Sequence, residues 1–300
     1  MHTQILPVPA VDYCFLRIIA ARTPVVCTVH ELVPHSAKYR RLAGACFAAI
    51  YRRADFVFAF TEYTRQRLIQ LGVEAEKIMK IPHGNLEHLL SHVSAREART
   101  PQKLPIVLSI GGIRHDKGID TLVEATRYLR DLVPGVRVQI AGTPGFDLSV
   151  LHARIKELGI DDIVEFRLGY LSDREFSEHM QNAEVIALPY RRIEQSGVAI
   201  AACTFGKAIV GTRCGGLEEL VSEAGNGLLV PVDDPAALAQ ALSMILLSPE
   251  KREAFEVRSR AYARNVLGWG SIVSKTLAGY RVALGRPTTR KREVATTQEI

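Results

Sequence analysis

The sequence lacks the features that mark membrane-spanning and disulfide-bonded proteins. None of its apolar runs approaches the roughly 20 residues that a helix needs to cross a bilayer. Its five cysteines are odd in number and lack metal-ligand spacing, so we expect reduced thiols in a cytoplasmic protein. The Met1 end carries no basic segment before its apolar residues, and we therefore expect no signal peptide.

The chain also has only a modest excess of charge of one sign. Its 38 lysines and arginines against 32 acidic residues give a net charge of +6 over 300 residues, which favours an anionic partner without specifying it. No RNA- or DNA-binding motif is recognisable, so a nucleic-acid partner is not expected. A hydrophobic content of 47% is too high for a disordered chain and fits one large or two ordinary folded domains.

Short apolar runs alternate with segments of helical periodicity along most of the chain. Such alternation predicts an α/β fold, with parallel sheets covered by helices on both faces. The polar stretch from Leu89 to Lys103 is typical of a linker, and the last sixteen residues are typical of a disordered tail. The predicted strands are residues 24–29, 56–60, 78–81, 106–110, 136–141, 163–168, 185–188, 208–211 and 228–230.

In parallel sheets, the loops after the carboxyl ends of the strands carry the binding groups. The loop after strand 106–110 joins the glycine pair Gly111–Gly112 to Arg114 and Lys117 ahead of a helix. Glycines let the backbone approach an anion and the cations neutralise it, so this loop predicts phosphate binding. It matches neither GxGxxG nor GxxxxGK[ST], and a tight turn with solvated charges is the alternative.

A second polar loop follows strand 185–188. Gly197 is expected to begin the next helix, where free amide N–H groups and the helix dipole would face a ligand. Glu194 is badly placed as a cap for this helix and better placed to accept hydrogen bonds from a polyol. The alternative is an acid exposed on a loop.

Three weaker signals lie elsewhere. His30 ends strand 24–29, where it would face a crevice, although a lone histidine is more often structural; His83 is expected in a turn. The stretch Gly215–Glu219 indicates another close backbone approach or a plain turn. Basic residues bracket the apolar segment 42–51, which suits either a membrane-surface helix or a buried helix with solvated ends.

Taken together, these stretches resemble glycosyltransferase family 4, the retaining sugar-nucleotide transferases with a GT-B fold. The resemblance implies two Rossmann-like, doubly wound parallel-sheet domains that face each other across a cleft. It predicts an acceptor-side domain at 1–98, a nucleotide-sugar-binding domain at 104–268, a helix packing back toward the first domain at 269–284 and a tail at 285–300. The stretches that carry it, in the family's order, are Thr28–His35, Lys80–Gly84, Ile110–Gly118, Leu168–Asp173 and Ala187–Val221.

The resemblance also implies roles for single residues. The candidate catalytic residues are His30, which would face the donor sugar from the first domain, and Glu194, the first glutamate of a Glu-x7-Glu motif. Glu219 matches the acid of the family's Gly-Gly-x-x-Glu stretch. The binding residues would be Gly112, Arg114, Lys117, Gly197 and Val198 for the donor diphosphate, Glu194, Gln195 and Ser196 for the donor sugar, and Gly169 and Tyr170 for the base.

The sequence departs from the family pattern in three places. The second motif glutamate, which usually binds the ribose, falls on Ala202, and Gly112 replaces an arginine that here follows as Arg114. Far fewer residues precede the Thr28 strand than in the family. We therefore expect an incomplete first domain, either because the chain is an N-terminally truncated fragment or because the domain is pared down. Its exposed sheet edges predict poor behaviour alone or completion by a second polypeptide.

The resemblance implies hexose transfer from a UDP-, GDP- or ADP-sugar to a glycan or lipid-linked acceptor in cell-envelope or exopolysaccharide biosynthesis. No metal or other cofactor is expected, because there is no Asp-x-Asp motif and two cations with a helix dipole would stabilise the diphosphate. The protein would be cytoplasmic, with a peripheral contact to an anionic membrane face. Two alternatives stay open: a non-catalytic nucleotide-sugar-binding remnant or partner subunit, and a nicotinamide oxidoreductase, which the lack of GxGxxG opposes.

Overall fold

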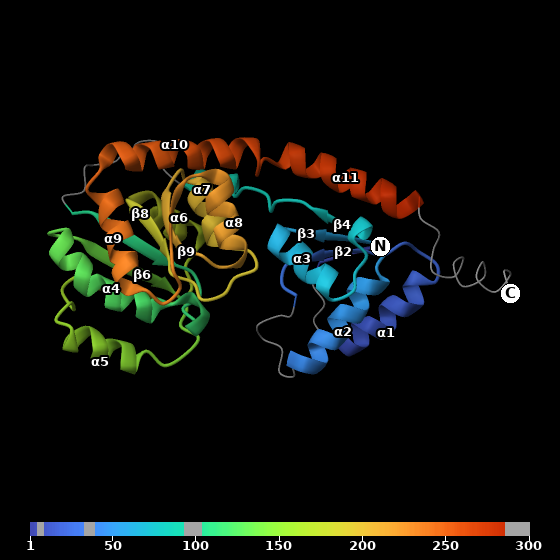
Figure 1. Ribbon diagram of the computed structural model, residues 1–300, viewed down its shortest axis with the longest axis horizontal. Coiled ribbons are helices and arrows are strands. Elements are labelled where there is room, and N and C mark those ends of the chain that lie inside the picture. The colour runs from blue at the N-terminus through green and yellow to red at the C-terminus, as the bar shows by residue number, and fades with distance from the viewer. Residues whose placement is uncertain (5–8, 33–39, 93–103, 286–300) are drawn as a thin grey trace, which may run out of the picture. The chain divides into compact units, whose positions relative to one another are not determined.

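The structure is a computed structural model that describes residues 1–4, 9–32, 40–92 and 104–285 (Figure 1). It divides into two compact units, one of Met1–His83 with the residues from Trp269 on, the other of Gly84–Gly268. His35, Lys38 and the predicted tail beyond residue 285 lie outside the described residues. Within the described ranges, no helix is both long enough and apolar enough to span a bilayer.

The first unit is built on a four-stranded parallel sheet in the order β1-β2-β3-β4. Leu16, Phe47 and Leu68 from its helices join Val57 in a core on one face of this sheet. On the other face α11 (Trp269–Gly285) packs so closely that a Cβ on Gly279 would lie 2.4 Å from the ring of Phe58. The remaining elements are β1 (His2–Thr3), α1 (Pro9–Ala20), β2 (Val26–Val29), α2 (Arg40–Arg53), β3 (Phe56–Ala59), α3 (Glu62–Gln70), η1 (Ala75–Lys77) and β4 (Ile78–Lys80).

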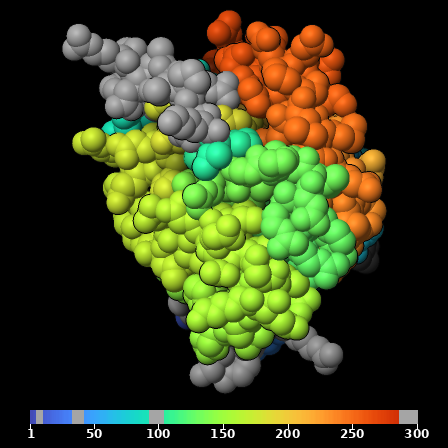
Figure 2. All heavy atoms as spheres, turned by 90° about the vertical axis from the view of Figure 1, so that its left-hand side faces the viewer, coloured from blue at the N-terminus to red at the C-terminus, as the bar shows by residue number. Residues whose placement is uncertain are grey.

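The second unit is a six-stranded parallel sheet in the order β10-β9-β8-β5-β6-β7, with helices on both faces. Helices α4, α5 and α9 pack on one face and α6, α7 and α8 on the other. Figure 2 shows the side of this unit on which α4, in green, adjoins α9 and α10, in orange. Its strands are β5 (Ile106–Ile110), β6 (Arg137–Gly142), β7 (Val164–Leu168), β8 (Val185–Leu188), β9 (Ala208–Thr212) and β10 (Gly227–Val230). Its helices are η2 (Glu87–His92), η3 (His115–Lys117), α4 (Ile119–Leu132), α5 (Ser149–Glu157), α6 (Asp173–Asn182), α7 (Gly197–Thr204), α8 (Gly215–Ala224), α9 (Pro235–Leu246) and α10 (Pro249–Asn265).

Local sequence signals explain where several helices begin. The hydroxyl of Thr61 accepts a hydrogen bond from the backbone N–H of Thr64 and caps α3. Ser172 and Glu175 form a reciprocal capping box at the start of α6. Both caps follow from the local sequence, because a hydroxyl ahead of an amphipathic run satisfies amide groups that the helix leaves unpaired.

The linker predicted from Leu89 is wrong for its first residues. Glu87–His92 form η2, Leu89 is buried, and its carbonyl accepts a hydrogen bond from the hydroxyl of Ser177 on α6. The segment is too short and too polar for its period to indicate a helix, and its helical turn depends on packing against α6.

The strand order of the second unit changes direction between β5 and β8. From β5 the chain builds outward through β6 and β7, and it then returns to add β8, β9 and β10 on the other side. In open parallel sheets a ligand crevice lies at such a switch point, outside the carboxyl ends of the two central strands. The loops after β5 and β8 are therefore neighbours in space, although about 80 residues separate them in the sequence.

Candidate functional site

The two loops at the switch point touch along their backbones. Gly118 has a φ of +62°, and a Cβ there would lie 1.9 Å from the carbonyl oxygen of Pro189. Similarly, a Cβ on Gly111 would lie 3.3 Å from the side chain of Val198 at the start of α7. The glycines after β5 thus allow its loop to lie directly against the β8–α7 loop.

Arg114 lies half-exposed at this edge of the sheet. Its Nε is 3.0 Å from Oδ1 of Asp116 and its second terminal nitrogen is 3.1 Å from Oδ2, a bidentate pair that fixes the plane of the guanidinium. A Cβ on Gly112 would come within 3.6 Å of the same guanidinium. The absence of a side chain at Gly112 therefore leaves the cation accessible beside an exposed stretch of backbone.

Lys117 is positioned by a buried aromatic ring. Its Nζ lies 3.7 Å from the centre of the Tyr190 ring, a cation–π contact between the two loops. Burial raises the pKa of Tyr190, which keeps its hydroxyl protonated and hydrogen-bonded to Ser196. Burial also raises the pKa of the Cys214 thiol, against the opposing effects of its hydrogen bond with Thr212 and of the Lys117 charge.

The start of α7 presents backbone amides close to these cations. Ser196 is the N-cap, and its hydroxyl accepts a hydrogen bond 3.1 Å from the backbone nitrogen of Ala199. Gly197 is exposed, and a Cβ there would meet no atom within 4 Å, so the first turn of the helix is open to a ligand. Glu194 and Gln195 lie half-buried in the loop just before it.

Gly169 and Tyr170 follow β7, at the same carboxyl edge but two strands from β5. The backbone N–H of Gly169 donates a 3.0 Å hydrogen bond to the carbonyl of Gly142. Gly142 in turn packs on Gly111, where a Cβ would lie only 1.8 Å from the Gly111 carbonyl oxygen. The Tyr170 side chain is 87% exposed and offers a free ring face.

His30 belongs to the first unit and lies at the carboxyl end of β2. Its ring packs edge-on to Phe60, with centroids 4.8 Å apart, and lies 6.4 Å from the ring of His83. Burial lowers the pKa of His30 and the charge of His83 lowers it further, against the opposing effect of Glu31. His83, expected only as a turn residue, is therefore an electrostatic neighbour of the candidate catalytic histidine.

The position of the second motif glutamate is closed to any ligand. Ala202 lies in α7 with none of its surface exposed, packed in the core with Ala199 and Leu188. A methyl group in that environment has no means to bind a ribose. Glu219, on α8, is half-buried.

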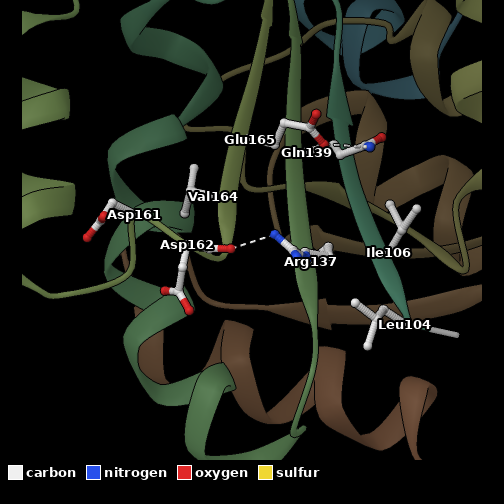
Figure 3. Close-up of a pocket in the computed structure, with 8 residues that line it drawn as sticks. All are labelled: Leu104, Ile106, Arg137, Gln139, Asp161, Asp162, Val164 and Glu165. Atoms are coloured by element: carbon white, nitrogen blue, oxygen red, sulfur yellow. Dashed lines mark hydrogen bonds between the residues drawn. The ribbon is translucent and has the colours of Figure 1, made fainter.

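A pocket of about 690 Å³ opens at the other edge of the second unit (Figure 3). It lies at the amino-terminal ends of β5, β6 and β7, where Arg137 donates a 2.6 Å hydrogen bond to the carbonyl of Asp162. None of the candidate site residues lines it. In the described ranges of the chain, no group of three or more histidine, cysteine, aspartate or glutamate side chains is arranged to hold a metal ion.

Sequence reasoning missed three residues that shape the site. Tyr190 holds Lys117, and Arg191 and Asp233 form an ion pair whose Nε–Oδ1 distance is 2.7 Å. Tyr190 and Arg191 follow a buried strand and the proline after it, and this placement could have revealed them. Asp233 carried no such signal, because its partner is 42 residues away.

Comparisons with known proteins agree with this architecture. The family model for glycosyl transferases group 1 matches residues 93–262, and that for Glycosyltransferase Family 4 matches residues 2–85. A D-inositol 3-phosphate glycosyltransferase of Acidothermus cellulolyticus is 30% identical over 274 residues, covering 87% of this chain and 59% of the relative. A GDP-mannose-dependent alpha-(1-6)-phosphatidylinositol monomannoside mannosyltransferase of Mycolicibacterium smegmatis is 26% identical over 247 residues, covering 79% of this chain and 62% of the relative. The chain thus spans about three fifths of the length of these relatives.

Solved structures share the fold at low sequence identity. Alr3699/HepE from Anabaena, in complex with UDP, is 22% identical with a TM-score of 0.75, over 90% of this chain and 76% of that one. Sucrose-phosphate synthase from Thermosynechococcus elongatus is 23% identical with a TM-score of 0.77, over 93% and 72%. These likenesses confirm the predicted α/β class with two parallel sheets of the GT-B type. Because the family model for glycosyl transferases group 1 matches more than half of the residues of this chain, the chain belongs to that family.

Proposed function

We propose that this chain is a glycosyltransferase that moves a hexose from a nucleotide diphosphate sugar to a glycan or lipid-linked acceptor, with retention of the anomeric configuration. The observation that carries the proposal is the cluster of Arg114, Lys117 and the open start of α7 at the switch point of a chain in this family. The relatives support it by their names, and HepE by its complexes with UDP and UDP-glucose.

In this proposal the donor diphosphate lies over the loop after β5. Arg114 and Lys117 supply two positive charges, and the amides of Gly112, Gly197 and Val198 supply backbone donors. Helix α7 adds the positive end of its dipole, because an anion at a helix N-terminus is stabilised by the unpaired N–H groups. Negative charge grows on the diphosphate as it departs, so these groups would stabilise the transition state more than the bound donor.

The donor sugar and base would lie on either side of the diphosphate. Glu194 would accept hydrogen bonds from sugar hydroxyls, with Gln195 and Ser196 beside it, and the Gly169–Tyr170 turn would contact the base. The exposed ring of Tyr170 suits stacking on a nucleobase. His30 stays the candidate catalytic residue of the first unit, where its lowered pKa favours a neutral imidazole.

The chemistry proposed is a front-face displacement through an oxocarbenium-like state. The bond from the anomeric carbon to the diphosphate oxygen breaks, and the acceptor oxygen attacks from the same face. The acceptor proton leaves with the departing phosphate. No metal is part of this proposal, since two cations and a helix dipole would stabilise the charge of the departing diphosphate.

Acceptor, location and partners belong to the same proposal. A basic protein of this family suits a cytoplasmic role in envelope or exopolysaccharide biosynthesis, with peripheral contact to an anionic membrane.

A second candidate is a nucleotide-sugar-binding remnant or partner subunit without turnover. The burial of Ala202 favours it, because the group that usually binds the ribose in the family is replaced by a core methyl. Binding with no turnover would separate this candidate from the transferase.

The test is a pair of assays on the purified chain across UDP-, GDP- and ADP-sugars. We expect saturable binding of one donor, weakened at least about tenfold in Arg114→Ala or Lys117→Ala, and slow donor hydrolysis that Glu194→Ala abolishes. Arg130→Ala is the matched control, because Arg130 lies in the last turn of α4, away from η3. Absence of binding to every donor, or equal loss in the control, would overturn the proposal.

A further inference from the structure

Arg191 joins three separate loops at the carboxyl edge of the second unit. It lies in the loop after β8, and its backbone N–H donates a 2.8 Å hydrogen bond to the carbonyl of Asp116 in η3. One terminal nitrogen donates to the carbonyl of His115 at 2.8 Å, also in η3. The backbone and side chain of one residue therefore both hold the segment that carries Arg114 and Lys117.

The guanidinium of Arg191 also forms a bidentate pair with Asp120 in the first turn of α4. The two nitrogen–oxygen distances are 2.9 and 2.7 Å. Burial alone would raise the pKa of Asp120, but the hydrogen bonds and charge of Arg191 hold it below its usual range. The carboxylate is thus ionised at neutral pH, and the planar fork of the arginine fixes the angle between the two loops.

A third loop is tied in through Asp233, between β10 and α9. Nε of Arg191 lies 2.7 Å from Oδ1 of Asp233, and the hydroxyl of Thr121 donates to the same oxygen at 3.1 Å. Asp233 has a φ of +57°, and no other non-glycine residue among those described has a positive φ. A backbone held in the left-handed region persists where surrounding contacts fix it, and such residues cluster at functional sites.

The energy of these pairs suggests what they are for. The side chains are 31 to 59% exposed, and ion pairs exposed to this degree contribute little to folding stability. Their geometric effect matters more, because they tie three loop segments together at one point next to Lys117 and the start of α7.

We propose that Arg191, held by Asp120 and Asp233, is a positioning residue that sets the spacing between the Arg114–Lys117 loop and the start of α7, and so the affinity of this edge for a diphosphate. This inference rests on the proposed donor site. It adds a residue that binds no ligand itself and acts through the groups that do.

The experiment measures binding of UDP and of inorganic pyrophosphate to the whole chain, together with amide hydrogen exchange over the two loops. In Arg191→Gln we expect binding of both probes to weaken about 5- to 20-fold, with faster exchange in η3 and in residues 191–197. Asp120→Asn and Asp233→Asn keep the arginine but each removes the charge of one of its ion-pair partners. Each should weaken binding of both probes about threefold. Arg130→Gln is the control and should change neither measurement.

The outcomes separate the explanations. Weaker binding in Arg191→Gln with unchanged or tighter binding in both aspartate variants would mean that Arg191 contacts the anion itself, which overturns a positioning role. A lower unfolding midpoint with unchanged affinity would mean that the contacts serve stability alone, and this also overturns it. If the unaltered chain binds neither UDP nor pyrophosphate, the proposed function fails. Unchanged hydrogen exchange in Arg191→Gln would independently show that Arg191 does not hold the loops.

Discussion

The carboxyl edge of the first sheet carries the aromatic rings of His30, Phe60 and His83, whereas that of the second carries the cations Arg114 and Lys117 beside glycines. In the first unit the rings pack on one another, and burial keeps the His30 imidazole neutral. In the second, glycine turns let two loops meet, Asp116 pairs with Arg114, and the Tyr190 ring lies against Lys117. We therefore expect the same parallel topology to give an anion-binding edge only where cations and close backbone approach coincide with a reversal of strand order.

The largest effect should come from forcing the two loops of the second unit apart. Gly118→Ala places a Cβ 1.9 Å from the Pro189 carbonyl oxygen, and we expect it to cost about 3 kcal/mol or more of unfolding free energy and to abolish UDP binding. Gly72→Ala in the first unit is the matched control, since Gly72 also has a positive φ but its nearest neighbour is 3.4 Å away. It should cost only about 1 kcal/mol. Urea unfolding, followed with a spectroscopic probe in each unit, measures the unfolding free energy of both variants. Equal losses of unfolding free energy would contradict the role of the close approach between Gly118 and Pro189.

The helix caps that follow β3 and β8 give the next largest effect. Thr61→Ala and Ser196→Ala each remove a hydroxyl that accepts a hydrogen bond from the third residue of its helix, and each should cost about 1 kcal/mol. Only Ser196→Ala should also weaken UDP binding, because only α7 begins beside the cations. Calorimetric titration of both variants with UDP makes the comparison. Equal weakening of UDP binding in the two variants would show that the carboxyl edges of the two sheets do not differ in anion binding.

The smallest effect concerns pH and the first unit. The folded-state pKa of His30 is lowered, so the unfolded chain binds its proton more readily, and stability should fall as the pH drops from above 6.5 toward the folded pKa. His83→Gln removes a neighbouring charge and should raise the His30 pKa, which lessens this dependence. An NMR titration of the His30 ring proton reads the pKa directly. A midpoint at or above 6.5 in the unaltered chain would contradict the burial of this ring.

Much of the candidate site could be located from the sequence because its signals are local. A glycine pair after an apolar strand indicates a turn at the strand end, and the placement of Gly112, Arg114, Lys117 and Gly197 at one sheet edge follows from the parallel topology. The partners of these residues could not be predicted. Nothing near Lys117 in sequence indicates the Tyr190 ring beneath it, and the burial of Ala202 depends on packing against strands from elsewhere in the chain.

The sequence by itself determined the alternation of strands and helices, the caps at Thr61 and Ser172 and the basic, glycine-rich loop after β5. These features depend on residues within a few positions of each other, where propensity and hydrogen bonding act directly. The tertiary structure alone decided that β8 lies beside β5, that Leu89 is buried against α6, and that Arg191 meets Asp120 and Asp233. Contacts between residues 40 to 90 positions apart arise from the order in which strands join a sheet, and short-range sequence patterns do not encode that order.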